Sequence, residues 1–335
     1  MKNRFTLPPA LAAALLALSW PAHDALPIPD PFADPATVTL ESGRTYTGVL
    51  AGLADGRVTV VVPDGSGEVE YSLAVERIAK VRFPEKERAE EALVLYREKD
   101  YENALPLLDS IYRQRLPYLR LLTPEQEKPL VVLVRIHRET GATIDAVVAA
   151  RRLGRELRDP VHREELAAIK LRGYLDLELH ERAGEDARAW CARQQRHPDS
   201  ALGWEVLAEI ALREERFDDA LWIALQPIAF ASAAPMEFLE PAYVAALRAC
   251  RELGDDSQGL ALYGDMRERE LSVPEECPQG VDAVAHFAAL WEAENKATSA
   301  SDDSGPLLDS RPPKADLNLP LRNVRRLLLA LPVIE

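Results

Sequence analysis

Cysteine, histidine and aromatic residues are scarce in this chain of 335 residues, which has three cysteines, six histidines and 6% aromatic residues. Three cysteines exclude a scaffold held together by many disulfides. His162, His180 and His197 are 18 and 17 residues apart, which is not the spacing of zinc ligands. The composition therefore predicts no metal site and no cofactor.

Basic residues are also fewer than acidic residues. The 40 lysines and arginines are outnumbered by 55 aspartates and glutamates, so the formal net charge is -15. This excess of negative charge argues against nucleic-acid binding driven by bulk attraction to phosphates. We therefore expect an acidic globular protein that has no nucleic-acid partner.

Familiar catalytic motifs are missing from the sequence. There is no glycine-rich phosphate loop, no H-E-x-x-H and no G-x-S-x-G. The acidic pairs Glu90-Glu91 and Glu164-Glu165 fall on predicted helical faces, where runs of charge are normally solvated. The sequence thus predicts no catalytic residues and a non-enzymatic protein. An enzyme with an unfamiliar site stays open as a third class of function, and a deep pocket of convergent ionisable groups would distinguish it.

A hydrophobic run long enough to cross a bilayer is missing at the amino terminus. Lys2 and Arg4 are followed by the apolar run Leu7–Trp20, which has the length of a signal peptide, whereas a membrane span needs about 20 residues. The sequence predicts a secretion signal over residues 1–25, with the cleavage position after Ala22 or Ala25 left open. A buried amino-terminal helix is the alternative, which the prolines of the run disfavour.

Residues 26–36 contain four prolines and are expected to form an extended linker. We accordingly expect an exported protein of the periplasm or cell envelope. Cys191 and Cys250 fall within predicted helices and are expected in the core, whereas Cys277 falls in a loop. In an oxidising compartment, a disulfide between Cys250 and Cys277 is an alternative.

Apolar residues alternate with a period of two over residues 37–84, which predicts five short strands separated by Gly and Asp turns. The segment Val38–Leu50, with a turn at Gly43 and a bent second strand at Gly48, resembles the opening of an Sm-like or SH3-like barrel. The segment Glu76–Pro84 resembles the closing strand. Five short strands in under fifty residues predict a small closed or nearly closed β-barrel. Because the segment lacks the polar loop signatures of RNA-binding Sm-like proteins, we expect a structural cap or docking module.

The period becomes helical over residues 85–297. The clearest unit has Trp204, Leu207 and Ala208 on a first helix and Ala220 on a second, and it resembles the tetratricopeptide repeat (TPR). Further units align on one small residue of the second helix. These anchors, which are 42, 41, 33 and 39 residues apart, are Ala104, Ala146, Ala187, Ala220 and Gly259.

A terminal capping helix is expected over residues 280–297. The fold class predicted is mainly α: an α-solenoid of TPR-like helix pairs preceded by a small five-stranded β-barrel. A plain helical bundle is the competing structural interpretation.

The TPR resemblance implies a curved groove lined by the first helix of each pair. The groove positions expected to bind a partner are Tyr96, Arg97, Arg135, Arg138, Asp176, Glu209, Arg213, Arg248 and Arg251, and they are joined by Leu93, Glu139, Leu179, His180, Leu212 and Glu252. This set has six arginines against four acids, so we expect a locally positive groove for an acidic segment or a chain terminus of a protein partner. Solvated helix faces with pairing between residues i and i+4 are the alternative.

The carboxyl end combines a polar and an apolar part. Residues 298–318 are rich in Ser, Asp and Pro and predict a flexible linker, and residues 319–335 form an apolar segment that carries Arg322, Arg325 and Arg326. This segment is expected to dock on its own helical array, to insert into another protein, or to contact a membrane surface.

The function expected is a non-enzymatic scaffold of the bacterial cell envelope that binds a protein or peptide segment in a TPR-like groove. The alternative is a regulatory or substrate-recruiting subunit of an envelope enzyme or of an energy-transducing inner-membrane complex.

Overall fold

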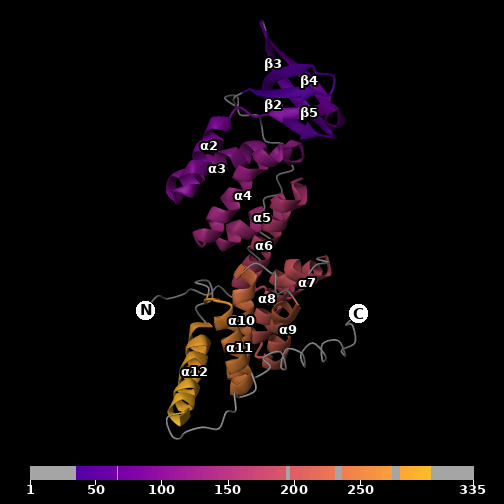
Figure 1. The fold of residues 1–335 in the computed structure, drawn as a ribbon. Coiled ribbons are helices and arrows are strands. Elements are labelled where there is room, and N and C mark those ends of the chain that lie inside the picture. The colour runs from indigo at the N-terminus through magenta and orange to yellow at the C-terminus, as the bar shows by residue number, and fades with distance from the viewer. Residues whose placement is uncertain (1–34, 66, 194–196, 231–235, 274–279, 303–335) are drawn as a thin grey trace. The chain divides into compact units, whose positions relative to one another are not determined.

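The structure is a computed structural model that describes residues 35–65, 67–193, 197–230, 236–273 and 280–302 (Figure 1). The expected signal segment, most of the two expected linkers, the apolar carboxyl segment and Cys277 lie outside these residues. The chain divides into two compact units, residues 1–179 and 180–335. Within the described residues, no helix is both long and apolar enough to span a membrane.

The first unit begins with five antiparallel strands in the order β4-β3-β2-β1-β5. Their bounds are β1 Ala36–Leu40, β2 Thr45–Ala54, β3 Arg57–Asp64, β4 Gly67–Ala74 and β5 Ile78–Arg82, and the 3-10 helix η1, Val75–Arg77, joins the last two. The five strands confirm the period-two prediction. The expected bend in β2 is also present: its first half pairs with β1 and its second half pairs with β3.

Gly48 lies at this bend because no larger residue fits there. A Cβ atom added to Gly48 would lie 2.1 Å from the carbonyl oxygen of Val61 on β3. Only glycine therefore lets the two strands approach so closely where β2 changes its partner.

The prediction of a closed barrel is wrong, because β4 and β5 are the two unpaired edges of the sheet. Helical residues complete the packing instead. The Gln126 side chain donates its amide hydrogen from Nε2 to the carbonyl of Val81 on β5, at 2.9 Å, and so occupies an acceptor of that edge strand.

The sheet shares one hydrophobic core with the helices that follow it. Side chains of the strands and of the helices form a single buried cluster, which includes Val38, Val58, Val60, Val81, Ile111, Leu130, Leu153 and Leu166. The sheet thus docks on the first helices of its own unit, as expected of a cap or docking module.

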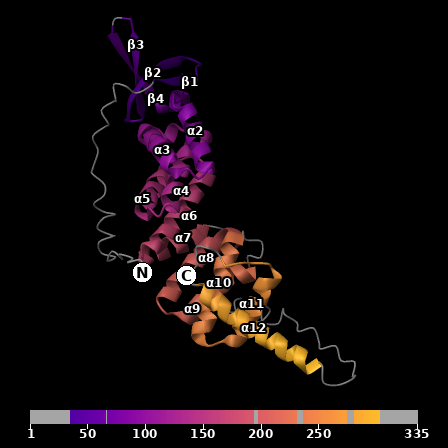
Figure 2. The ribbon, with the colours of Figure 1, turned by 90° about the vertical axis from the view of Figure 1, so that its left-hand side faces the viewer.

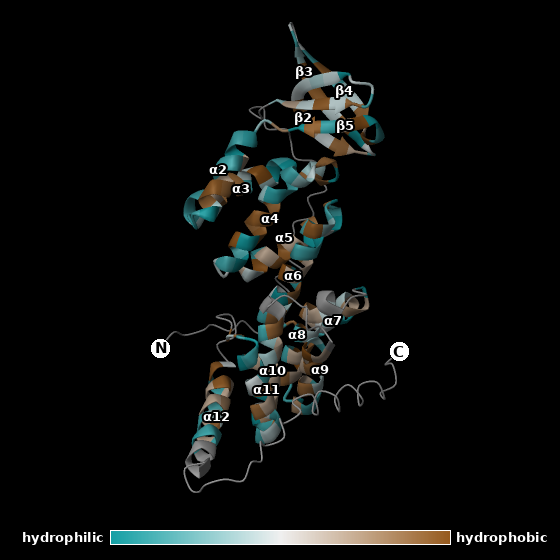
Figure 3. Cartoon of the chain, viewed as in Figure 1, coloured by the Kyte–Doolittle hydropathy of each residue, from teal (hydrophilic) through white to brown (hydrophobic). Residues whose placement is uncertain are grey.

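The helices of the first unit follow one another beyond the sheet (Figure 2). They are α2 Lys86–Arg97, α3 Tyr101–Arg115, the 3-10 helix η2 Leu116–Leu121, α4 Pro124–Glu139, α5 Thr143–Glu156 and α6 Pro160–Asp176. The second unit contains α7 His180–Arg193, α8 His197–Arg213, α9 Phe217–Phe230, α10 Met236–Leu253, α11 Asp256–Glu268 and α12 Val281–Asp302. Hydrophobic and hydrophilic residues alternate along individual helices (Figure 3), as expected where each helix buries one face.

A repeated turn joins the two helices of each successive pair. One residue of each turn has a positive φ angle, and these residues are Lys99, Gly141, Glu178, Glu215 and Gly254. The positive-φ residue donates its N–H to the carbonyl three residues before it. The next residue donates to the carbonyl five residues before it, as in Lys99 to Tyr96 and Asp100 to Leu95. This is the Schellman ending of a helix.

The five turns lie 42, 37, 37 and 39 residues apart, so the same helix-ending turn recurs along the chain at a spacing of one helix pair. The small residue that follows five positions after each turn residue is buried, and these residues are Ala104, Ala146, Ala183, Ala220 and Gly259. Four of the five predicted anchors are confirmed. The remaining anchor was placed one helical turn too late, at Ala187, because Ala183 and Ala187 are both fully buried on one face of α7.

The last pair is covered by α12, which contains the expected capping helix and runs on to Asp302. A Cβ atom added to Gly259 of α11 would lie 2.1 Å from a ring carbon of Phe287 on α12. Phe287 is fully buried. The missing side chain at Gly259 is therefore what lets the terminal helix dock.

The turn residues that are not glycine predict a stabilising substitution. Lys99 has a φ angle of 61°, which strains a residue with a Cβ atom, whereas Glu98 beside it has a φ angle of -80°. We expect Lys99→Gly to raise the free energy of unfolding by about 0.5–1 kcal/mol and Glu98→Gly to lower it. Urea unfolding followed by circular dichroism measures both. A loss of stability in Lys99→Gly would contradict the assignment of this turn.

Candidate functional site

Most of the predicted groove positions fall at repeated places on the first helices, two, three or six residues before the positive-φ residue of each turn. Leu179 and His180 do not, because they follow the turn residue Glu178 and His180 begins the second helix α7. In the first unit these places hold Leu93, Tyr96 and Arg97 on α2 and Arg135, Arg138 and Glu139 on α4, with Asp176 on α6. In the second unit they hold Glu209, Leu212 and Arg213 on α8 and Arg248, Arg251 and Glu252 on α10. We call these two sets the first-helix rows.

Glu139 is the centre of a tyrosine cluster in the first unit. The Tyr96 hydroxyl donates to Oε1 of Glu139 at 3.1 Å, and the Tyr101 hydroxyl donates to Oε2. The two rings are stacked, with centroids 6.1 Å apart. The hydrogen bond to Glu139 raises the pKa of Tyr101 to about 12, because losing the phenolic proton would place two negative charges side by side. The predicted groove residues did not include Tyr101.

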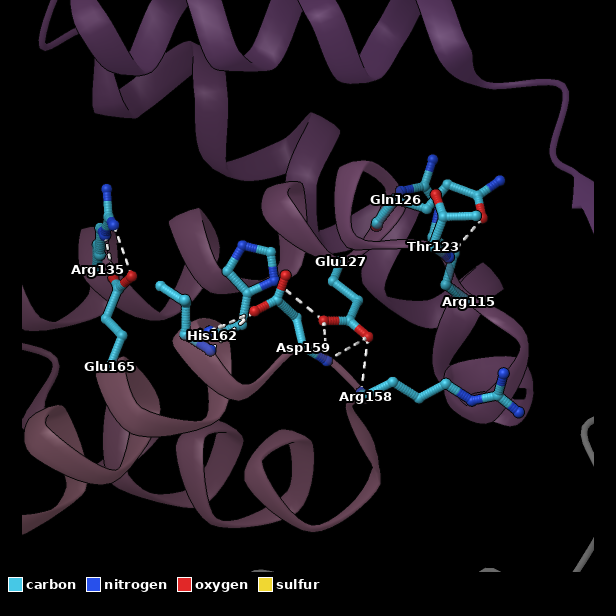
Figure 4. A network of polar contacts seen from close by, with 10 residues as sticks. Arg115, Thr123, Gln126, Glu127, Arg135, Arg158, Asp159, His162 and Glu165 are labelled. Atoms are coloured by element: carbon cyan, nitrogen blue, oxygen red, sulfur yellow. Dashed lines mark hydrogen bonds and ion pairs between the residues drawn. The ribbon is translucent and has the colours of Figure 1, made fainter. Parts of the chain in front are cut away.

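Arg135 extends this network from α4 to α6. Its Nη2 donates to Oε2 of Glu165 at 2.6 Å and its Nε donates to Oε1, so the guanidinium binds the carboxylate with two parallel bonds (Figure 4). The bonds to Glu165 raise the pKa of Arg135. Arg135 also interacts with Tyr96, so one chain of polar contacts runs from Tyr101 through Glu139, Tyr96 and Arg135 to Glu165.

The second unit has an equivalent contact between first helices. Glu209 of α8 accepts a bond from Nη1 of Arg248 on α10 at 2.6 Å, and a bond from Nε of Arg213 on its own helix at 3.1 Å. Glu209 and Arg248 are 39 residues apart, which is the distance between the two turns that follow them. The repeat spacing therefore contained the signal that would have predicted this pair.

A further polar cluster in the second unit was not predicted from the sequence. The hydroxyl of Tyr243 on α10 donates to Oδ2 of Asp265 on α11, and Arg269 binds the other oxygen of Asp265 at 3.2 Å. Burial and the bond to Asp265 raise the pKa of Tyr243. In the helical pattern Tyr243 has the position of an ordinary core residue, and its partner lies on the next helix.

Some arginines in the first-helix rows are exposed. Arg97 lies on the surface of α2, where its Nε donates to the carbonyl of Leu93 at 3.2 Å. Arg251 is exposed on α10, and the described residues offer its side chain no hydrogen bond or ion pair. Arg138 is partly buried, and Asp176 is exposed at the end of α6. The rows thus combine carboxylates and arginines that neighbouring helices hold in place with arginines that face solvent.

Glu127 is a buried carboxylate that holds the loop before α6 (Figure 4). It is fully buried, and its oxygens accept the backbone N–H groups of Arg158 at 2.8 Å and Asp159 at 3.3 Å. Its Oε2 also lies 3.0 Å from Nδ1 of His162. Asp159 in turn caps α6 by accepting the N–H of Val161 at 2.8 Å. These contacts fix the start of α6 and therefore the position of Glu165 on that helix.

A buried ion pair joins the sheet to the helices of the first unit. Nε of Arg115 at the end of α3 donates to Oε1 of Glu85 at 3.0 Å, and the two side chains are 3% and 2% exposed. Arg115 Nη1 also donates to the carbonyl of Gln126 at 2.6 Å, and Gln126 binds Val81 of β5. This network positions α2 and α4, which carry the first row, against the sheet.

Of the two described cysteines, Cys250 is a core residue, as expected, and Cys191 is only partly buried. Cys250 is fully buried, and Cys191 lies between α7 and α8, close to Gly203. Burial raises the pKa of both thiols to about 12. Among the described residues, no group of three or more histidines, cysteines, aspartates or glutamates is arranged to hold a metal ion.

Fold and site together define a helical-pair repeat protein with an open five-stranded sheet at its amino-terminal end. No family model and no curated protein matches the sequence. Among solved structures, the chain is similar to two structures from Podosopora anserina, titled as a putative kinesin light chain with nearly identical TPR-like repeats, one of them carrying a single substitution. Both are 19% identical over 55% of this chain and 93% of theirs, with TM-scores of 0.43 and 0.42.

Proposed function

We propose that this protein is a non-enzymatic scaffold of the bacterial cell envelope that binds a segment of a partner protein along the first-helix rows. The observation that supports this most directly is the pairing between successive first helices, through Arg135 and Glu165 in one unit and Glu209 and Arg248 in the other. These pairs hold polar groups in fixed positions before a partner arrives. A preorganised surface loses less conformational entropy on binding.

The exposed arginines of the rows are the proposed anchors for the partner. Arg135 and Arg248 are already bonded to carboxylates, so each row is more evenly charged than the count of six arginines and four acids suggested. Arg97 and Arg251 are exposed, and a guanidinium is well suited to binding a carboxylate with two bonds. An acidic side chain or a chain terminus of the partner is therefore the proposed ligand at these two positions.

The proposed location in the envelope depends on the sequence of the amino terminus. Lys2 and Arg4 before the apolar run Leu7–Trp20 favour export. We expect osmotic shock to release the chain from intact cells, and retention in the cytoplasm would contradict the location.

Photo-crosslinking identifies the partner, and charge reversal tests the anchors. A photoreactive amino acid at position 97 or 251 captures the partner in intact cells, and the purified partner is then titrated. We expect the double variant Arg97→Glu/Arg251→Glu to bind at least about 10-fold more weakly, because hydrogen bonds to charged groups contribute about 1.5–3 kcal/mol each.

The matched control is Arg82→Glu/Arg193→Glu, which changes the net charge equally at two exposed arginines outside the rows. This control should stay within about two-fold of the original affinity, since isolated surface charges contribute little. Equal losses in the two double variants would show that only overall charge matters and would contradict binding along the rows.

A further inference from the structure

Exposed arginines lie near the ends of α3 and α5, on these two helices, on η2 and in the loop that follows α5. We call this set the α5 arginine surface, and its members are Arg113, Arg120, Arg151, Arg155 and Arg158. The Nε atom of Arg120 on η2 donates to Oε2 of Glu156 at 2.6 Å, which places η2 against the end of α5. The segment 151–158 contains four arginines and one glutamate in a chain whose net charge is -15.

These arginines differ from those of the first-helix rows because most have no partner within the described part of the protein. Among the described residues, the side chains of Arg113, Arg151, Arg155 and Arg158 make no hydrogen bond or ion pair. An arginine in the last turn of a helix interacts favourably with the helix dipole. This interaction explains why Arg155 lies at the end of α5, but it does not apply to Arg151 or Arg158. Arg113, Arg151 and Arg158 therefore present positive charge that no described side chain pairs with.

An exposed apolar residue lies beside these charges. Val161, in the first turn of α6, is 68% exposed, the highest value among the exposed large hydrophobic residues of the described chain. Pro160 before it is also exposed, and exposed Arg158 and Arg163 flank the two. Glu127 holds this loop through the backbone of Arg158 and Asp159, and the Arg158 side chain extends away from that contact (Figure 4). The loop is therefore a fixed protrusion.

We propose that the α5 arginine surface and Val161 bind a bilayer that contains anionic phospholipid. Guanidinium groups bind phosphates with two bonds, and a basic residue near an anionic membrane contributes roughly a five-fold increase in partitioning. A rigid valine among arginines adds apolar area that can enter the boundary between headgroups and acyl chains. An acidic protein would satisfy the arginines but would not need the protruding valine. This surface lies on other residues than the first-helix rows, so its test is independent of the proposed function.

Vesicle titration of the full-length chain tests the proposal, using mixed phosphatidylglycerol and phosphatidylcholine vesicles beside pure phosphatidylcholine vesicles. We expect Arg151→Ser/Arg155→Ser/Arg158→Ser to lower the partition coefficient on the anionic vesicles about 100-fold. The matched control, Arg77→Ser/Arg82→Ser/Arg193→Ser, removes the same charge from three exposed arginines outside the α5 arginine surface and should change the partition coefficient less than about three-fold. Circular dichroism confirms that the variants are folded.

Two more measurements distinguish a bilayer from a soluble polyanion. Val161→Ser leaves the charge unchanged and should weaken binding about five-fold, since it removes apolar area. Hydrogen exchange should slow in residues 151–163 on anionic vesicles and not on neutral ones. Absence of binding, equal losses in both triple variants, or no protection of residues 151–163 would each overturn the proposal. An unchanged affinity in Val161→Ser would also overturn it, in favour of an acidic protein or another polyanion.

Discussion

Replacing Arg115 by leucine should lower the free energy of unfolding of the first unit by about 3–5 kcal/mol. The substitution leaves Glu85 buried without its guanidinium partner and removes the bond from the guanidinium to the carbonyl of Gln126. It also removes the contact between the guanidinium and the ring of Phe83, whose centroid lies 5.5 Å from Arg115 Cζ. An uncompensated carboxylate in a low-dielectric interior is the main cost.

The double variant Glu85→Leu/Arg115→Leu is the matched control, because it removes the buried charge altogether. It should recover at least half of the lost stability, since buried ion pairs are often replaced by apolar residues at little cost. Urea unfolding followed by circular dichroism measures the total change, and hydrogen exchange of β5 and α3 locates it. If the single and double variants were equally unstable, packing rather than buried charge would explain the loss.

Replacing Glu127 by leucine should cost about 3 kcal/mol or more, because the backbone N–H groups of Arg158 and Asp159 would lose their acceptor inside the protein. Glu127→Gln keeps one acceptor oxygen and should cost less. Glu125→Leu, two residues away on the exposed surface of the same helix, should cost under about 1 kcal/mol. Thermal unfolding ranks the three variants, and equal effects at positions 125 and 127 would contradict the role assigned to the buried carboxylate.

The periodicities that predicted strands and helices are local properties, and the structure confirms them. Alternation over residues 37–84 predicted the strands, and the bend in the second strand at Gly48 was expected from the resemblance to small barrels. Small residues at a repeated spacing predicted the helix pairs, with a one-turn error at Ala187 where two alanines on one face fitted equally well. Closure of the barrel was predicted wrongly, because it depends on what else covers the strands.

The polar networks were the part that sequence reasoning missed. Glu127 has the sequence context of an ordinary acidic residue in a first helical turn, yet it binds backbone groups about 30 residues away. Glu165 belongs to an acidic pair expected to be solvated, yet it binds Arg135. Which charges face each other depends on how helices pack, and a single sequence shows this only where the repeat spacing is regular, as for Glu209 and Arg248.

The longest interval between turns, 42 residues against 37 for the two that follow, contains η2. This 3-10 helix carries Arg120, contributes Leu119 and Leu121 to the core that the strands share, and leads to Gln126. The additional residues of the first repeat therefore form the surface on which the sheet packs. The η2 segment and the sheet thus form one structural module of the first unit.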